Sequence, residues 1–174
     1  MTDAKQKVLV AYATRAGSTA GVAKRVAEVL NRNGFAAQAT DIKEAGDTVP
    51  YDAVVLGSSI RAGKLMPEVL SFIEKNRADL TAKPLAAFVV CLTMKERDDK
   101  SRAVASAYLN PVHMHVTPLS EGLFAGAYDP SKLGFVERTV MKMIKAPAGD
   151  FRNWAEIETW AGSLVRLFTY GPTI

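Results

Sequence analysis

The sequence predicts a three-layer α/β fold, in which a parallel sheet lies between two layers of helices. Three continuous apolar runs support this prediction, at Lys7–Ala13, 52–58 and 84–92. Strands that are apolar throughout, rather than at every second position, are covered on both faces, as in the parallel sheets of α/β proteins. Each run is followed by small or polar residues and then by a helical pattern, which predicts repeated βα units.

The remaining elements follow the same alternation. Residues 18–33 place valine and leucine on one face and charged residues on the other, which predicts an amphipathic helix that ends at Gly34. A weaker strand is expected at 35–41. The other expected elements are helices at 66–78, 98–109 and 151–168 and a fifth strand at 121–127.

Two helix boundaries can be predicted from single residues. Asn110 precedes Pro111, and a residue before proline avoids helical dihedrals, so the helix at 98–109 is expected to end there. Asp150 is a suitable cap for the last helix. The pattern of the segment 113–118 fits either a strand or a loop.

The composition fits one domain, expected to span residues 1–174. The hydrophobic fraction is 48% and the charged fraction 23%, as in soluble domains. The single cysteine, Cys91, excludes an intrachain disulfide and a cysteine-based metal cluster and favours a reducing, cytoplasmic location. No run approaches the ~18 apolar residues of a membrane span, and residues 1–7 lack a secretory layout.

The charge pattern limits the classes of partner. A formal net charge of +4 favours anionic partners, such as a phosphorylated cofactor, a carboxylated substrate, an acidic protein or a lipid surface. Nucleic acid is not expected, because the sequence has no zinc-finger spacing, aromatic RNA-binding motif or long basic run. His113 and His115 would share one face of a strand, but without a nearby carboxylate or cysteine no metal site is expected.

The most informative segment is the loop between the first strand and the first helix, Thr14-Arg-Ala-Gly-Ser-Thr19. The unpaired N–H groups of a first helical turn and the helix dipole both favour an anion at this position. Thr14, Ser18 and Thr19 add hydroxyl groups, and Gly17 lets the backbone curve closely around a ligand. The loop therefore predicts a cradle for a phosphate monoester, with an ordinary Ser/Thr-capped helix as the alternative.

Two other kinds of phosphate loop fit this segment less well. A nucleoside-triphosphate loop needs G-x-x-x-x-G-K-[ST], and no lysine follows the glycine here. A dinucleotide loop needs three glycines in the pattern G-x-G-x-x-G, of which only Gly17 and Gly21 are present, although Asp41 would suit a ribose. The pattern disfavours NAD without excluding it.

The spacing T-x-x-G-x-T, from Thr14 to Thr19, resembles the FMN phosphate loop of flavodoxins. The resemblance covers nearly the whole chain. It implies a flavodoxin-like three-layer sandwich whose five-stranded parallel sheet has the order 2-1-3-4-5, as known for flavodoxins. It also implies that FMN is held without a covalent bond at the carboxyl ends of the strands.

A narrower resemblance concerns the segment Gly57-Ser-Ser-Ile-Arg-Ala-Gly63. It looks like the G-x-S-I-R-x-G segment of menaquinone-dependent protoporphyrinogen IX dehydrogenases, and Phe124-Ala-Gly126, residues 140–145 and Trp154 are similar to that branch as well. The aromatic-rich insertion of the branch is represented here only by residues 128–135. The resemblance implies an FMN-dependent oxidoreductase of haem biosynthesis that passes electrons to a quinone. The alternatives are a flavodoxin-like carrier of electrons between redox enzymes and a flavin-binding regulator without turnover.

The resemblance further implies where the cofactor lies. The isoalloxazine ring would lie between the loops 58–64 and 92–97, where Arg61 or Lys64 would stabilise an anionic reduced flavin. Neither loop contains an aromatic residue, which favours a less negative two-electron couple and an open ring face. No catalytic side chain is expected, because the flavin carries the chemistry. The implied cofactor-binding residues are Thr14, Arg15, Ala16, Gly17, Ser18, Thr19, Ser58, Ser59, Ile60, Arg61, Ala62, Gly63, Leu92, Thr93, Met94 and Tyr128.

Residues 132–145 predict a basic amphipathic helix. Such a helix can lie in the interface of an anionic membrane, and the same pattern fits a helix packed on the sheet with a solvated basic edge. The expected location is therefore the cytoplasm, with contact to the inner face of the cell membrane as an open alternative. The oligomeric state is left open. The apolar face comprises Leu133, Val136, Val140, Met143 and Ile144, and the cations mostly off it are Lys132, Arg138, Lys142 and Lys145.

Overall fold

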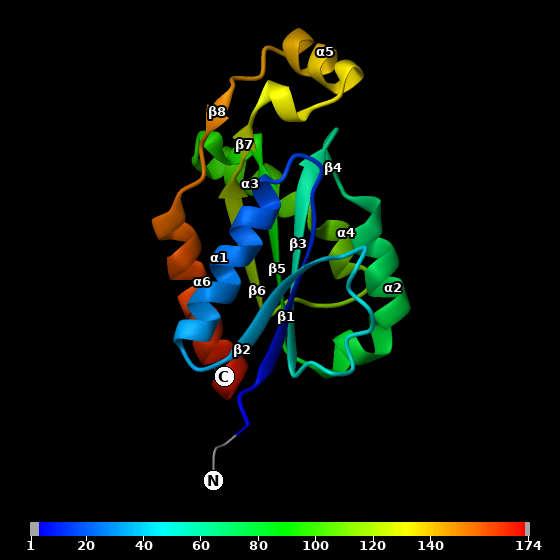
Figure 1. Cartoon of the computed structure of the whole chain (residues 1–174), viewed down its shortest axis with the longest axis vertical. Helices are drawn as coiled ribbons and strands as arrows, with labels where there is room; N and C mark the ends of the chain where they lie inside the picture. Colours follow the sequence, from blue (N-terminus) through cyan, green and yellow to red (C-terminus); the bar gives the residue numbers. More distant parts are fainter. Residues whose placement is uncertain (1–3, 173–174) are drawn as a thin grey trace.

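Five parallel strands form the central sheet of the computed structural model, which describes residues 4–172 of the predicted domain 1–174 (Figure 1). Their order is β2-β1-β3-β5-β6, so the predicted flavodoxin-like fold and strand order are confirmed. A short strand, β4 (Lys64–Leu65), pairs antiparallel with the end of β3. The parallel strands are β1 (Lys7–Ala13), β2 (Ala36–Asp41), β3 (Ala53–Arg61), β5 (Leu85–Cys91) and β6 (Ser120–Ala125).

Helices cover both faces of the sheet. On one face lie α1 (Ser18–Arg32) and α6 (Trp154–Tyr170), and on the other lie α2 (Pro67–Ala82), α3 (Asp99–Ala107) and α4 (Asn110–His113) (Figure 1). Successive side chains of a strand point to opposite faces, so each strand supplies both layers of the core. In β1, for example, Val8 and Val10 pack towards α1, whereas Leu9 and Ala11 pack towards α2.

The core requires a glycine in the middle of β3. A Cβ atom added at Gly57 would overlap the ring of Phe88 on the neighbouring strand β5. Phe88 is fully buried and makes an edge contact with Trp160 of α6, with ring centroids 5.9 Å apart. The absence of a side chain at Gly57 thus allows α6 to cover the sheet closely.

The predicted end of the helix at 98–109 is close, since α3 ends at Ala107, whereas the predicted start of the last helix is wrong. Asn110 and Pro111 do not simply end a helix but open α4, where a proline in the first turn costs no hydrogen bond. Residues after His113 form turns rather than a strand. The last helix begins at Trp154, and Asn153 caps it by accepting a hydrogen bond from the Glu156 amide at 3.2 Å. Asp150 is instead part of a strand and binds Arg152.

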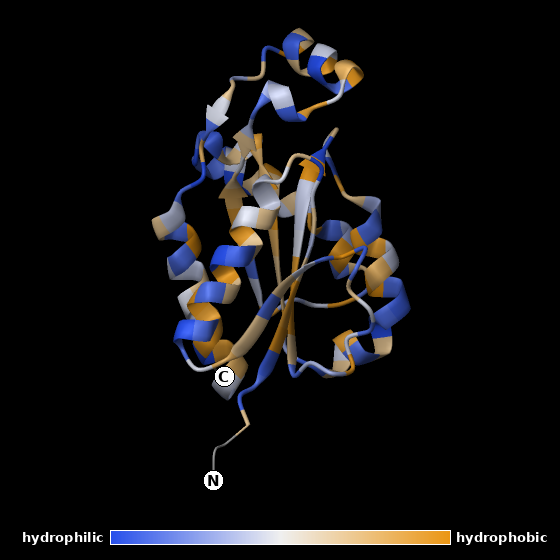
Figure 2. Cartoon of the chain, in the orientation of Figure 1, coloured by the Kyte–Doolittle hydropathy of each residue, from blue (hydrophilic) through white to orange (hydrophobic). Residues whose placement is uncertain are grey.

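The segment 127–150 leaves the compact body and returns to it. Its two ends pair as β7 (Ala127–Tyr128) and β8 (Gly149–Asp150), and between them lie the 3-10 helix η2 (Pro130–Lys132) and helix α5 (Phe135–Met143). Helix α5 lies beyond the carboxyl ends of the strands and carries both hydrophobic and hydrophilic positions (Figure 2). None of its residues is buried, so the alternative of a helix packed on the sheet is wrong.

Among residues 4–172, no helix has both the length and the apolar character that crossing a bilayer requires.

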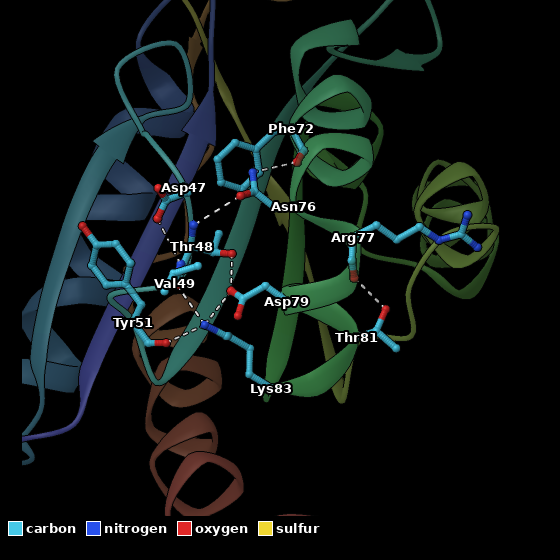
Figure 3. A network of polar contacts seen from close by, with 10 residues as sticks. All are labelled: Asp47, Thr48, Val49, Tyr51, Phe72, Asn76, Arg77, Asp79, Thr81 and Lys83. Atoms are coloured by element: carbon cyan, nitrogen blue, oxygen red, sulfur yellow. Dashed lines mark hydrogen bonds and ion pairs between the residues drawn. The ribbon is translucent and has the colours of Figure 1, made fainter.

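A buried polar network fixes the long loop between β2 and β3 to helix α2 (Figure 3). The Thr48 amide donates to Asn76 Oδ1 at 3.2 Å, and the Thr48 hydroxyl donates to Asp79. Lys83 Nζ lies 2.6 Å from Asp79 Oδ2 and donates to the carbonyl oxygens of Thr48 and Tyr51 at 2.8 and 2.7 Å. Since Thr48 is fully buried, its polar atoms need these partners.

We predict that Asp79→Asn lowers the free energy of unfolding by about 1–3 kcal/mol at neutral pH, the cost of breaking a buried charged hydrogen bond. Burial alone would raise the pKa of Asp79, but hydrogen bonds from Lys83 and Thr48 outweigh it and hold the pKa below its usual value. A lowered pKa stabilises the fold above the unfolded pKa, and this stability is lost as the pH falls through the folded pKa. Urea unfolding from neutral to acidic pH should therefore show a smaller acid-induced loss in the variant.

The control is Glu74→Gln on the exposed side of the same helix, which should stay within about 0.5 kcal/mol of the parent. Equal unfolding midpoints for Asp79→Asn and the parent would contradict the role of the network.

Candidate functional site

Loops from four parallel strands meet at one edge of the sheet. The register pairs Ala13 with Ser58, and Cys91 with Ala125, so the carboxyl ends of β1, β3, β5 and β6 lie side by side. Between β1 and β3 the strand order reverses, because β2 lies on the outer side of β1. Ligands of open α/β sheets bind in the crevice at such a switch point.

The first loop enters α1 through a left-handed turn. Gly17 has φ 89°, a conformation that glycine adopts readily, and its amide donates to Thr14 Oγ1 at 3.0 Å. No side chain caps α1, so the alternative of an ordinary Ser/Thr-capped helix is not what this loop forms. The first-turn amides and the positive end of the helix dipole therefore lie open towards the edge of the sheet.

Thr19 is the strongest sign of a ligand. Its side chain is fully buried, and its hydroxyl finds no hydrogen-bond partner within the described residues. A buried hydroxyl without a partner costs about 1–3 kcal/mol and calls for an explanation. Thr19 is the second residue of α1, in the same turn as the open amides. Sequence analysis predicted this residue for its hydroxyl alone, and its burial adds an independent reason.

The strand β3 is longer than predicted. Ser59, Ile60 and Arg61 were expected in a loop, but they continue β3, because Ile60 pairs with Leu65 and Arg61 with Lys64 across a hairpin. The turn of this hairpin consists of Ala62 and Gly63, with φ 49° and 73°. The predicted ring loop is thus only two residues long.

Ser58 holds this hairpin in place. It is buried, and its hydroxyl donates to the Ser59 carbonyl at 2.8 Å and accepts from the Met66 amide at 3.0 Å. Its side chain therefore has a structural role, and only the backbone near it faces the edge.

The two predicted arginines both form ion pairs. Arg15 lies 2.8 Å from Glu68 Oε1, and Arg61 pairs with Glu137 of α5. A hydrogen bond from its own backbone amide, together with Arg15 and Lys43, lowers the pKa of Glu68. Arg61 thus bridges the hairpin and the outlying segment, and its place beside a flavin ring stays a prediction.

The loop after β5 contributes a 3-10 helix, η1 (Leu92–Lys95), to the same edge. Leu92 and Thr93 are half-buried, and the Thr93 hydroxyl lies 3.4 Å from Tyr108 Oη. Met94 packs in the core, so its side chain is directed away from any ligand at the edge. Burial raises the pKa of the preceding Cys91 thiol, which keeps it in the unreactive protonated form.

Tyr128 lies at the base of the outlying segment. It is 7% exposed and pairs with Gly149 in the β7–β8 ladder. Tyr128 thus lies just beyond the end of β6, where the outlying segment begins.

Sequence reasoning did not assign Gly126, Phe151 and Arg152 to the site, although all three lie at this edge. Gly126, after β6, lies against the first loop, since a Cβ added there would be 3.6 Å from Ser18 Oγ. Its carbonyl accepts from the Phe151 amide at 3.1 Å, and Lys95 lies over the Phe151 ring. Arg152 donates to the Ser18 carbonyl at 3.4 Å. The polar run before Trp154 was a signal that this stretch is a loop rather than the start of a helix.

The two histidines are arranged differently from the prediction. His113 ends α4 and pairs with Glu121 of β6, so a carboxylate does lie beside it. Within residues 4–172, no three His, Cys, Asp or Glu side chains are grouped as a metal site would need.

Comparison with known families supports the fold. The flavodoxin domain family matches residues 9–153, which is most of the chain. The chain belongs to the flavodoxin domain family. The predicted resemblance to flavodoxins is thereby confirmed.

This flavodoxin domain is also similar to proteins named protoporphyrinogen IX dehydrogenase [quinone]. The one from Leishmania major is 26% identical over an alignment of 181 positions, which covers 96% of this chain and 78% of the relative. The one from Escherichia coli strain K12 is 25% identical over an alignment of 182 positions, which covers 97% of this chain and 99% of the relative. Among solved structures, a flavodoxin from the domain Archaea has a TM-score of 0.57 at 14% identity and covers 95% of this chain and 100% of its own.

We predict that Thr19→Val separates ligand binding from stability. The change removes an unpartnered hydroxyl at nearly constant volume, so the protein without ligand should be equally stable or more stable by up to about 1 kcal/mol. Its affinity for FMN should fall about 10- to 150-fold, because a hydrogen bond to a charged phosphate is worth about 1.5–3 kcal/mol. Quenching of flavin fluorescence measures the affinity, and thermal unfolding measures the stability.

The matched control is Thr40→Val in β2, whose hydroxyl also lacks a partner among the described residues. It should leave the FMN affinity unchanged. A Thr19→Val variant that binds FMN as tightly as the parent would contradict the assignment.

Proposed function

We propose that this chain is an FMN-dependent oxidoreductase that passes hydrogen equivalents from protoporphyrinogen IX to a quinone. The observation that carries the proposal is the match to relatives of that name along nearly their whole length, 99% of the Escherichia coli protein. The segment Gly57-Ser-Ser-Ile-Arg-Ala-Gly63, which resembles that branch, lies at the edge of the sheet where a flavin would be held.

The residues at the edge fit FMN. The open amides of α1 and the hydroxyls of Thr14, Ser18 and Thr19 would hold the phosphate, and the unpartnered Thr19 hydroxyl supports this placement. The turn at Ala62 and Gly63 and the backbone of η1 would hold the ring between β3 and β5. The cofactor, when bound, supplies hydride and electron transfer, so the protein has to provide binding, orientation and access.

The protein therefore contributes to the reaction mainly by positioning the cofactor and the substrate. Gly63, with φ 73°, lets the turn approach a planar ring closely with backbone donors. Paired with Glu137, Arg61 contributes less positive charge to the ring site than a free guanidinium would. Helix α5 lies beyond the carboxyl ends of the strands (Figure 1), so in this proposal a substrate would approach the ring past this helix.

The acceptor side of the proposal involves a membrane. Phe135, Val136 and Met143 of α5 are 83%, 73% and 78% exposed, an unusual exposure for large apolar side chains. Lysines at 132, 142 and 145 are exposed on the same segment. In this proposal the protein works in the cytoplasm, and α5 lies in the interface of an anionic membrane that contains the quinone.

A first test is a visible spectrum of the purified protein, followed by anaerobic mixing with protoporphyrinogen IX and a soluble quinone analogue. The proposal predicts flavin absorbance, oxidation of the porphyrinogen and reduction of the quinone in proportion. Reduction of cytochrome c without oxidation of the porphyrinogen would instead indicate an electron carrier. A colourless protein that takes up no added FMN would overturn the cofactor assignment as well.

A second test is sedimentation with vesicles that contain anionic lipid. We predict that the protein sediments with them at low salt, and that replacing Lys132, Lys142 and Lys145 by Gln weakens binding about fivefold per residue, since each nearby cation contributes about 1 kcal/mol. Met143→Glu should also weaken binding.

The control for Met143→Glu is Met114→Glu, because Met114 is 79% exposed in another part of the surface. If the Met143→Glu variant bound the vesicles as tightly as the parent, α5 would not be the part of the protein that contacts the membrane.

A further inference from the structure

Arg152 reaches the opening turn of α1 from the far end of the chain. Its Nη1 atom donates to the carbonyl of Ser18, which lies 134 positions earlier in the sequence. The guanidinium also fills the space beside Gly21, since a Cβ atom added there would lie 2.6 Å from Nη1. The first turn of α1 therefore accommodates the arginine by having glycine at this position.

The position of Arg152 is fixed by two further contacts. Nε and Nη2 bind the two carboxylate oxygens of Asp150 at 2.9 and 2.7 Å, which is a bidentate pair. The guanidinium also lies over the Trp154 ring, 4.7 Å from its centroid. The side chain is 19% exposed, so it is largely shielded from solvent.

We propose that Arg152 recognises the phosphate group of the bound flavin and makes the site selective for FMN over riboflavin. This inference rests on the proposed function, because it assumes that FMN occupies the edge of the sheet. It brings a second arginine, from the stretch that follows the outlying segment, to a loop whose own cation, Arg15, pairs with Glu68.

Distance and donor count support this role. The path from the Ser18 carbonyl oxygen back to the Ser18 amide nitrogen spans three bonds, so Nη1 lies at most about 8 Å from an amide of the open turn. This is within about one screening length at physiological salt. Arginine has five N–H donors, of which Asp150 takes two and Ser18 one, so two stay available for a phosphate oxygen.

Asp150 offsets part of the positive charge of Arg152, as Glu137 does for Arg61, but it leaves two N–H donors of the guanidinium unused. The side chain of Asp150 is 49% exposed, so solvent screens its charge more than that of the largely shielded arginine. The hydrogen bond from Arg152 lowers the pKa of Asp150, which keeps the pair ionised at neutral pH. The pair therefore orients a charged guanidinium beside the open turn, and Asp150 acts as its positioning partner.

Arg25 offers a matched comparison. Its guanidinium lies over the same Trp154 ring at 4.9 Å from the centroid, but it is held by Glu28 and Glu158. Its backbone lies seven residues beyond Ser18, about 10 Å further along the helix. Substitution of Arg25 therefore reproduces a loss of stacking and of an ion pair without removing a hydrogen bond to the opening turn of α1.

The test compares the affinity of apoprotein for FMN with its affinity for riboflavin, which lacks the phosphate. Quenching of flavin fluorescence gives both dissociation constants for the parent and for Arg152→Gln, Arg152→Lys and Arg25→Gln. We expect Arg152→Gln to weaken FMN about tenfold and riboflavin less than twofold, and Arg152→Lys to keep most of the FMN affinity. Arg25→Gln should leave the ratio of the two constants unchanged.

The outcomes separate this inference from the proposed function. Equal weakening of both flavins by Arg152→Gln would show a structural role, and no weakening would show no role, so either result overturns the inference alone. If Arg152→Gln fails to fold, a changed FMN-to-riboflavin ratio in Arg152→Lys supports the inference, and an unchanged ratio overturns it. A parent protein that binds neither flavin would overturn the proposed cofactor itself.

Discussion

Parallel pairing of β1 with β3, and of β3 with β5, is the constraint on which the site depends. In a parallel sheet every strand ends at the same edge, so the residues after Ala13, Arg61 and Cys91 meet although they are far apart in sequence. The register is fixed because both faces of these strands are buried. A slip by one residue would turn every side chain towards the opposite helix layer, and both layers are apolar but differently shaped.

The same constraint explains why the site can retain unsatisfied groups. The backbone groups inside the sheet are paired along the ladders, whereas the first turn of α1 emerges beyond them with no side-chain cap. The buried Thr19 hydroxyl adds a second cost at the same place. A fold whose core is well packed tolerates a local loss of about 1–3 kcal/mol, and a ligand that supplies acceptors there recovers it on binding.

The sequence predicts those parts of this arrangement that have a period or a local motif. Continuous apolar runs identify the strands, and the hydroxyl-rich loop around Gly17 indicates the proposed phosphate end of the site. The extension of β3 could not be predicted, because its turn at Ala62 and Gly63 lacks the usual Asn-Gly signal. Contacts such as Arg152 with Ser18 join exposed or half-exposed polar residues 134 positions apart, and no periodicity encodes them. Asp150 was misassigned because a cap and a strand end have the same local composition.

The two ends of the site differ in how firmly they are held. The phosphate end belongs to β1 and α1, whose residues are part of the main core. The outlying segment is closed at its base by a two-residue ladder, β7 with β8, and the ion pair of Arg61 with Glu137 connects it to the hairpin after β3. An exposed ion pair contributes about 0–1 kcal/mol, and a two-stranded ribbon alone is marginal in water. A displacement of α5 therefore costs little and leaves the phosphate loop intact. Under the proposed function, which requires access for both a reduced substrate and a quinone, this separation would let access to the ring vary while the cofactor stays bound.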